Sequence, residues 1–179
     1  MRICLYGGPG IGKSTTAAKL FTELKKLGVN IELVTEYVKT WAWEDRKITS
    51  YDQVYIFGKQ LRAEDLLVRK GVNIITDSPL LLQLAYSRRN KDPFVPELLN
   101  IHTRFTETHP AFNILLRRTV PYSQHGRYET AAGAIEIDNI TKDLLHECGY
   151  TYINVAPGLD DSMLLAEVRY ALLKAGELP

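Results

Sequence analysis

Apolar residues along the chain alternate between two kinds of spacing. Short runs in which nearly every position is apolar predict strands that are buried on both faces. Between these runs, apolar residues recur every three or four positions, which predicts helices with one buried side. The predicted strands span 2–6, 30–35, 72–76, 112–116 and 150–155. The predicted helices span 13–27, 51–70, 79–87, 95–108, 135–148 and 160–175.

The order of these elements predicts the fold class. Alternating strands and helices build a parallel sheet with helices on both faces, so we expect an α/β fold with five strands. A chain of 179 residues fits a single domain, which we place over residues 1–179. Sheets of this kind bind ligands beyond the carboxyl ends of their strands. Residues directly after each strand are therefore the first candidates for a site.

Composition and charge narrow the class of protein only slightly. Apolar residues make up 45% and charged residues 24% of the chain, as in ordinary globular proteins, and the net charge of +1 favours neither nucleic acid nor membranes. No apolar stretch is long enough to predict a membrane span, and the direct entry into a strand predicts no signal peptide. Two cysteines, Cys4 and Cys148, lack metal-ligand spacing and fit a reducing cytoplasm, where we expect the protein.

The strongest chemical signal is the stretch GGPGIGKS at residues 7–14, which matches the phosphate-binding pattern G-x-x-x-x-G-K-[ST]. It lies between a predicted strand and a predicted helix, so backbone N–H groups and the helix dipole converge on one point. There Lys13 would neutralise the β- and γ-phosphates, and the Ser14 hydroxyl would ligate Mg²⁺. The other residues expected to contact the phosphates are Gly8, Gly10, Ile11, Gly12 and Thr15. The motif predicts binding of a nucleoside triphosphate, and no guanine-reading motif is visible, which favours ATP.

Acidic residues follow two of the predicted strands. Asp77, after the third strand, would hold Mg²⁺ beside Ser14, although it could instead cap the helix that starts at Pro79. Glu36, after the second strand, is placed to take a proton from an attacking hydroxyl, and the alternative is a surface glutamate. These positions suggest phosphoryl transfer.

Aromatic and basic residues nearby are candidates for binding the acceptor. Trp41 and Trp43 could stack on a planar base, or they could fill the core. Arg88 belongs to a basic cluster at residues 88–91, which could bind an acceptor phosphate or a nucleic-acid backbone, or could be solvated loop charge.

The polar segment around 118–134 has the length and placement of a lid. Arg118 and Arg127 in it could reach over the triphosphate and offset the charge that develops on the transferred phosphoryl group. The alternative is a solvated loop with arginines at its rim. We take both arginines as candidate catalytic residues.

The order of glycine loop, Thr-Glu-Tyr after the second strand, Thr-Asp-Ser after the third and an arginine-bearing lid resembles the phosphate-loop (P-loop) kinases of nucleosides and nucleotides. Within that group the chain looks like the compact, often phage-encoded kinases related to nicotinamide-riboside-kinase domains and placed near thymidylate kinase. The resemblance implies a single-domain P-loop kinase fold that uses ATP and Mg²⁺, in the host cytoplasm if a phage encodes it.

Deoxynucleoside kinases carry a similar stretch after the second strand, and four positions match it: Thr35, Glu36, Val38 and Trp41. The resemblance implies that Glu36 is the general base. It also implies that a glutamine on the next helix reads a base, which would be Gln53 or Gln60, and we take Gln60 as the candidate. One departure concerns the acceptor: Ser78 follows Asp77 where those kinases have arginine.

Residues 6–10 and 76–80 are also compatible with the 5-hydroxymethyluracil DNA kinases, a phage group that phosphorylates a modified base within DNA. We therefore expect an ATP:Mg²⁺-dependent kinase that acts on a hydroxyl or phosphate of a nucleobase-containing acceptor, either a small nucleoside or nucleotide or modified DNA. An ATPase or nucleotide switch is the alternative from another class. The sequence leaves the oligomeric state open, and a homodimer is compatible with it.

Overall fold

The computed structural model describes residues 1–49, 51–119, 122–123 and 128–178, and these build one five-stranded sheet in the order β2-β3-β1-β4-β5. All strand pairs are parallel. The strands are β1 (Arg2–Tyr6), β2 (Ile31–Val34), β3 (Asn73–Thr76), β4 (Ala111–Leu116) and β5 (Tyr152–Val155). The prediction of a parallel α/β sheet is confirmed.

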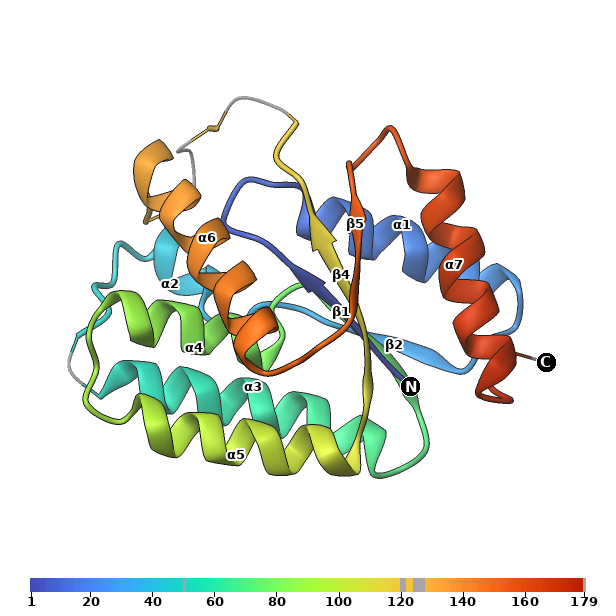
Figure 1. Ribbon diagram of the computed structural model, residues 1–179, viewed down its shortest axis with the longest axis horizontal. Coiled ribbons are helices and arrows are strands. Elements are labelled where there is room, and N and C mark those ends of the chain that lie inside the picture. The colour runs from blue at the N-terminus through green and yellow to red at the C-terminus, as the bar shows by residue number, and fades with distance from the viewer. Residues whose placement is uncertain (50, 120–121, 124–127, 179) are drawn as a thin grey trace.

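Helices cover both faces of this sheet (Figure 1). They are α1 (Lys13–Lys26), α2 (Lys39–Trp43), α3 (Asp52–Val68), α4 (Leu80–Arg89), α5 (Val95–Thr108), α6 (Ala131–Glu147) and α7 (Asp161–Lys174). The helices α1 and α7 pack on one face, and α3, α4, α5 and α6 pack on the other. None of the helices in the described part of the chain has the length and apolar character that a membrane span requires.

The central strand shows why a continuous apolar run is needed here. Successive side chains of a strand point to opposite faces. Accordingly, Ile3 and Leu5 of β1 join the core beneath α1 and α7, while Cys4 and Tyr6 join the core beneath the other four helices. All four are at most 1% exposed.

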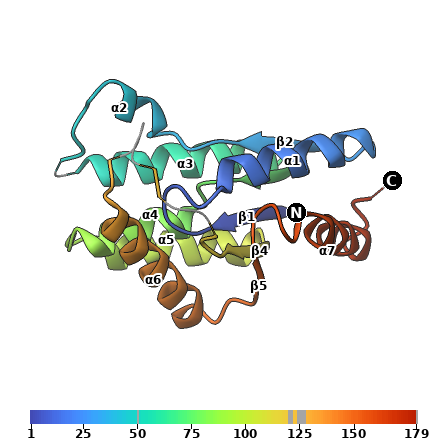
Figure 2. The ribbon, with the colours of Figure 1, turned by 90° about the horizontal axis from the view of Figure 1, so that it is seen from above.

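Two helices differ from the predictions. The helix α6 begins at Ala131, four residues earlier than expected, because the Thr130 hydroxyl accepts a hydrogen bond from the Gly133 backbone N–H (3.1 Å) and caps the helix. The five-residue helix α2 was not predicted, because so short a segment shows no apolar periodicity. Figure 2 shows that α2 and α6 lie towards the same end of the molecule as the loop between β1 and α1.

Candidate active site

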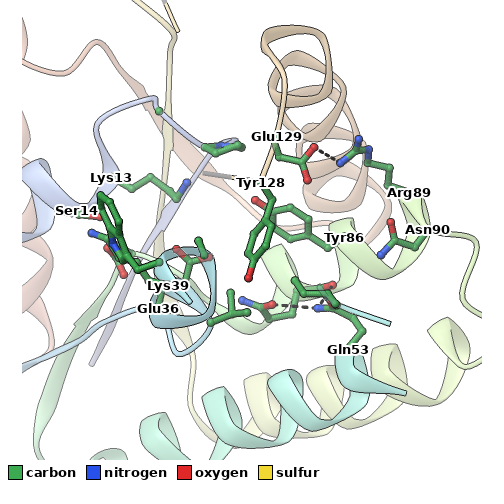
Figure 3. A pocket seen from close by; sticks show the side chains of 18 of the residues that line it. Lys13, Ser14, Glu36, Lys39, Gln53, Tyr86, Arg89, Asn90, Tyr128 and Glu129 are labelled. Carbon is green, nitrogen blue, oxygen red and sulfur yellow. Dashed lines mark hydrogen bonds and ion pairs between the residues drawn. The ribbon is translucent and has the colours of Figure 1, made fainter. Parts of the chain in front are cut away.

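A cleft of about 940 Å³ opens where β1, β2 and β3 end. Eight of the residues predicted for the site line it: Gly10, Gly12, Lys13, Ser14, Thr15, Glu36, Trp43 and Asp77. Figure 3 shows Lys13 and Ser14 at one end of this cleft and Arg89 and Asn90 at the other, with Tyr128 between them. The volume lies at the upper end of the range for ligand pockets, so the cleft has room for two substrates side by side.

The glycine loop has the backbone conformation that phosphate binding requires. Gly10 (φ 75°) and Gly12 (φ 100°) are left-handed, a conformation that costs glycine little. Crowding also favours glycine, since a Cβ on Gly10 would lie 2.9 Å from the ring of Tyr122. Directly after Gly12 the helix α1 begins, and no side chain caps it. Its first N–H groups are therefore available to an anion.

Lys13 is held within the loop itself. Its Nζ donates hydrogen bonds to the carbonyl oxygens of Gly7 (2.7 Å) and Gly8 (2.9 Å). Burial lowers the pKa of the Lys13 ammonium, and the nearby carboxylates of Glu36 and Asp77 oppose this shift. The ammonium thus lies in an enclosed site between the glycine loop and two acidic side chains, where phosphate oxygens would offset its desolvation.

Asp77 fits a magnesium site better than a helix cap. The helix α4 has Pro79 at its N-cap and no side-chain cap hydrogen bond, so Asp77 does not cap it. Asp77 is 4% exposed, and its Oδ1 has no hydrogen-bond partner among the described residues. A buried carboxylate oxygen of this kind is a suitable Mg²⁺ ligand, and Ser14 lines the same cleft. Within the described ranges no cluster of three or more His, Cys, Asp or Glu could hold a metal, so the ion would depend on these two residues and on phosphate oxygens.

Glu36 lies on the acceptor side of the glycine loop. It is half-buried, and its charge acts on the pKa of both Lys13 and Tyr86. Burial is the main cause of the raised pKa of Tyr86, and Glu36 adds to it. The carboxylate therefore lies within electrostatic reach of both Lys13 in the glycine loop and Tyr86 on α4.

The two tryptophans have different roles. Trp43 is 60% exposed and lines the cleft, as a base-stacking residue should. Trp41 is 5% exposed and packs against Val38 and Ile56, with the guanidinium of Arg46 3.4 Å from its ring centre. Of the two alternatives for Trp41, stacking on a base or filling the core, the structure therefore shows the second, because its side chain fills the interior beneath α2.

Gln60, the glutamine predicted to read a base, does not line the cleft. It is fully buried on the inner side of α3, and its Nε2 donates to the Thr76 hydroxyl (3.3 Å). Gln53, two helical turns earlier on the same side of α3, lines the cleft instead. Its Nε2 donates to the side-chain oxygen (3.1 Å) and the backbone oxygen (3.4 Å) of Gln83 on α4. Figure 3 shows this hydrogen bond at the edge of the cleft.

Within the basic cluster at residues 88–91, Arg89 and Asn90 line the cleft and Arg88 does not. Arg88 makes two hydrogen bonds of 2.8 Å to Glu147 on α6, outside the cleft. Its neighbour Arg89 lines the cleft and pairs with Glu129 and Glu136. One residue turns a helix by about 100°, so adjacent arginines face different surroundings.

The structure places only one of the two arginines that were predicted for the lid. Arg127 lies outside the described residues. Arg118 donates from Nε (3.0 Å) and Nη2 (2.8 Å) to Asp138 of α6, and from Nη1 to the Pro9 carbonyl (3.1 Å). It does not line the cleft, because these contacts hold it against the outer side of the glycine loop. Tyr128 donates from its hydroxyl to the Arg46 carbonyl (2.6 Å) and so connects the segment before α6 to the loop after α2.

Cleft residues that were not among the predicted candidates include Lys39, Gln83, Tyr86 and Tyr128. Gln53 was the stated alternative to Gln60, and its seven-residue spacing from Gln60 puts both on one side of a helix. No sequence signal distinguishes Lys39 or Tyr128 from ordinary surface residues.

Comparisons with known proteins bear on the family and the fold of the chain. No curated protein matches the chain. Among solved structures, it resembles deoxyadenosine kinase from M. mycoides, in a structure with dCMP and a flexible dCDP bound. The match has 21% identity and a TM-score of 0.59, and it covers 97% of this chain and 100% of that chain. It confirms the predicted kinase-type fold. A family model described as an AAA domain matches residues 2–160, and the chain therefore belongs to the AAA domain family.

Proposed function

We propose that this protein is an ATP:Mg²⁺-dependent kinase that transfers the γ-phosphoryl group to a nucleobase-containing acceptor. The observation that carries the proposal is the single cleft that joins the glycine loop to an acceptor end containing Glu36 and Gln53. The likeness of the fold to deoxyadenosine kinase supports it. The finer assignments below belong to the same proposal.

At the phosphate end, Lys13 and the N–H groups at the start of α1 would bind the β- and γ-phosphates. Ser14 and Asp77 would hold Mg²⁺, which supplies charge neutralisation on the phosphate oxygens. Arg127 remains our proposed residue for offsetting charge on the transferred group.

At the acceptor end, Glu36 would orient or deprotonate the attacking hydroxyl. Gln53 would read the base, and the orientation of its side-chain amide follows from the backbone carbonyl of Gln83. That carbonyl would repel the amide oxygen of Gln53, so the amide nitrogen is the atom that lies 3.4 Å from it. The oxygen of Gln53 is then left as an acceptor for an N–H group of the base.

A second candidate acceptor is a hydroxymethylated base within DNA. Four of the five exposed aromatic side chains that the structure describes lie at or next to the cleft: Trp43, Tyr51, Tyr55 and Tyr128. Lys39 and Lys47 line the same region. Aromatic platforms interleaved with cations are typical of surfaces that bind single-stranded nucleic acid. We call these four aromatic residues the aromatic rim.

Transfer of label from γ-³²P-ATP tests the proposal. The acceptors are a pool of nucleosides and monophosphates, ordinary DNA and DNA with hydroxymethylated bases. Label on a small molecule would establish a nucleoside or nucleotide kinase, and label on modified DNA alone would establish the second candidate. Free phosphate with no labelled acceptor would contradict both and favour an ATPase or nucleotide switch.

A further inference from the structure

A carboxylate on α6 reaches the glycine loop from outside the cleft. Oδ1 of Asp138 accepts a hydrogen bond from the backbone N–H of Gly8. Oδ2 of Asp138 accepts from Nε and Nη2 of Arg118, at 3.0 and 2.8 Å. One side chain thus binds both the glycine loop and Arg118, which lies two residues after the end of β4.

Arg118 completes a closed set of contacts. Its third nitrogen, Nη1, donates to the carbonyl of Pro9 at 3.1 Å. The outer half of the loop is therefore held at two consecutive residues, at the N–H of Gly8 by Asp138 and at the carbonyl of Pro9 by Arg118. Both charged side chains are largely shielded from solvent, with exposures of 22% and 18%.

The packing leaves little room for another arrangement. A Cβ on Gly8 would lie 2.4 Å from the backbone carbonyl oxygen of Ala134 on α6, so this glycine allows the helix to approach. The ring of Tyr122 lies against Gly10, and its hydroxyl donates to the Glu129 carbonyl (2.5 Å). The segment from Gly8 to Gly10 is therefore packed closely against α6 and the Tyr122 ring.

Such restraint matters because glycine-rich segments lose the most conformational entropy when they are ordered. A loop that must align several N–H groups on a phosphate binds more tightly if it is ordered beforehand. Hydrogen bonds between charged groups, and from N–H groups to carboxylates, are among the stronger ones available for this purpose.

We infer that Asp138 is a positioning residue for the triphosphate: it holds the Gly8–Pro9 segment in its phosphate-binding conformation and fixes Arg118 against that segment. The inference rests on the proposed ATP site, but it assigns a new role to α6. It also changes the role of Arg118, which would act on the loop rather than on the transferred phosphoryl group.

Direct nucleotide binding tests this inference without relying on turnover. Calorimetric titration with MgADP and with AMP would compare the wild type, Asp138→Ala, Asp138→Asn and Arg118→Gln. The matched control is Asp143→Asn, an exposed aspartate further along α6. We expect Asp138→Ala to weaken the binding of MgADP about tenfold, because one charge-assisted hydrogen bond to the glycine loop is lost. The binding of AMP should be unaffected.

The double variant Asp138→Asn, Arg118→Gln should lose less MgADP binding free energy than the sum of the two single losses, because the two residues act in one network. A purely structural role of Asp138 would instead lower the thermal midpoint and weaken the binding of MgADP and AMP alike. MgADP affinity of the Asp138 variants within twofold of wild type, or an equal loss in the control, would overturn the inference while leaving the proposed function intact. Wild-type protein that bound no nucleotide would overturn both.

Discussion

Glu36 and Lys13 face the same cleft, but they should fail in different ways when replaced. Glu36→Gln preserves the shape of the side chain but removes the proposed base. We therefore expect kcat to fall ~10²–10⁴-fold while the affinity for ATP is unchanged. Steady-state kinetics together with a nucleotide titration would measure both. Glu44→Gln, at an exposed glutamate just after α2, is the control. Full activity in Glu36→Gln would show that this carboxylate is not the base.

Asp77 should matter for the metal rather than for the nucleotide alone. Because its buried Oδ1 has no partner among the described residues, Asp77→Asn should remove a metal ligand with little change in packing. We expect turnover to be lost at ordinary Mg²⁺ and partly restored at high Mg²⁺, whereas Lys13→Ala should stay inactive at every concentration. Activity measured across a Mg²⁺ titration distinguishes the two, and an unchanged Mg²⁺ dependence in Asp77→Asn would contradict the assignment.

The lowered pKa of His102 leads us to expect that the folded protein becomes less stable in acid. Burial, and secondarily the charge of Arg2, lowers the pKa of His102 from 6.5 to about 3. Between these values the unfolded chain binds a proton that the folded protein does not. The free energy of unfolding should therefore fall as the pH falls below 6.5, by up to ~1.4 kcal/mol per pH unit from this residue.

Urea unfolding of wild type and His102→Gln at pH 7.5 and 5.5 would test this prediction. The variant should lose less stability between the two pH values than the wild type does. The exposed histidine variant His146→Gln should behave as the wild type. Identical pH dependence in all three proteins would show that His102 does not carry the effect.

At the scale of elements, a buried ion pair sets how α3 lies on the sheet. Arg2 of β1 donates from Nε (3.1 Å) and Nη2 (2.9 Å) to Glu64 of α3, and both side chains are at most 1% exposed. Removing one partner leaves a buried, unpaired charge. We expect Glu64→Leu to cost ~3–5 kcal/mol of stability by denaturant unfolding.

The double variant Arg2→Met, Glu64→Leu is the informative comparison for this pair. It removes both charges and should recover part of the stability lost in Glu64→Leu. If the double variant is less stable than the single variant, the packing of α3 depends on something other than charge pairing.

The composition of α3 explains why the sequence did not distinguish Gln53 from Gln60 as the glutamine that lines the cleft. The buried side of α3 carries polar residues, including Gln53, Gln60 and Glu64, so apolar periodicity alone does not reveal its register. Both glutamines lie on that side, and only the distance of each from the end of the sheet decides which one reaches the cleft. The same limit applies to α4, where Arg89 rather than Arg88 faces the cleft.

At the scale of the whole molecule, ligand binding should stabilise the fold, because the cleft draws on segments from Pro9 to Glu136. MgATP at one hundred times its Kd would add ~2.7 kcal/mol, or about 5–10 °C in Tm for a domain of this size. Thermal unfolding followed by fluorescence would measure the shift. The Lys13→Ala variant should show little shift, and an equal shift in that variant would place nucleotide elsewhere.

The aromatic rim makes a separate prediction about the acceptor. If DNA is the substrate, Trp43→Ala should weaken single-stranded DNA about tenfold or more, since one stacked base contributes ~1–3 kcal/mol. Tyr170→Ala, at an exposed aromatic residue on α7, should have no effect. Fluorescence anisotropy at several salt concentrations would measure both, and equal binding by all proteins would argue for a small-molecule acceptor.

The sequence by itself determined the α/β fold class, most element boundaries to within a few residues, and the glycine loop that lines one end of the cleft. These features are local: the glycine loop is eight consecutive residues, and the strands are continuous apolar runs. Asp77 and Glu36 followed from the rule that parallel strands end at one edge.

The tertiary structure alone decided which residues line the other end of the cleft and which contacts the glycine loop makes with α6. Packing against neighbouring elements decides which member of a pair of similar residues reaches the cleft, because the two differ in their rotation about a helix or their position along it. The pairs are Trp41 and Trp43, Gln53 and Gln60, and Arg88 and Arg89. Asp138 meets Gly8 across 130 positions of sequence, a contact that no local pattern indicates. The spacing of residues within an element can be read from the sequence, whereas the side that one element turns towards another is set by packing in the core.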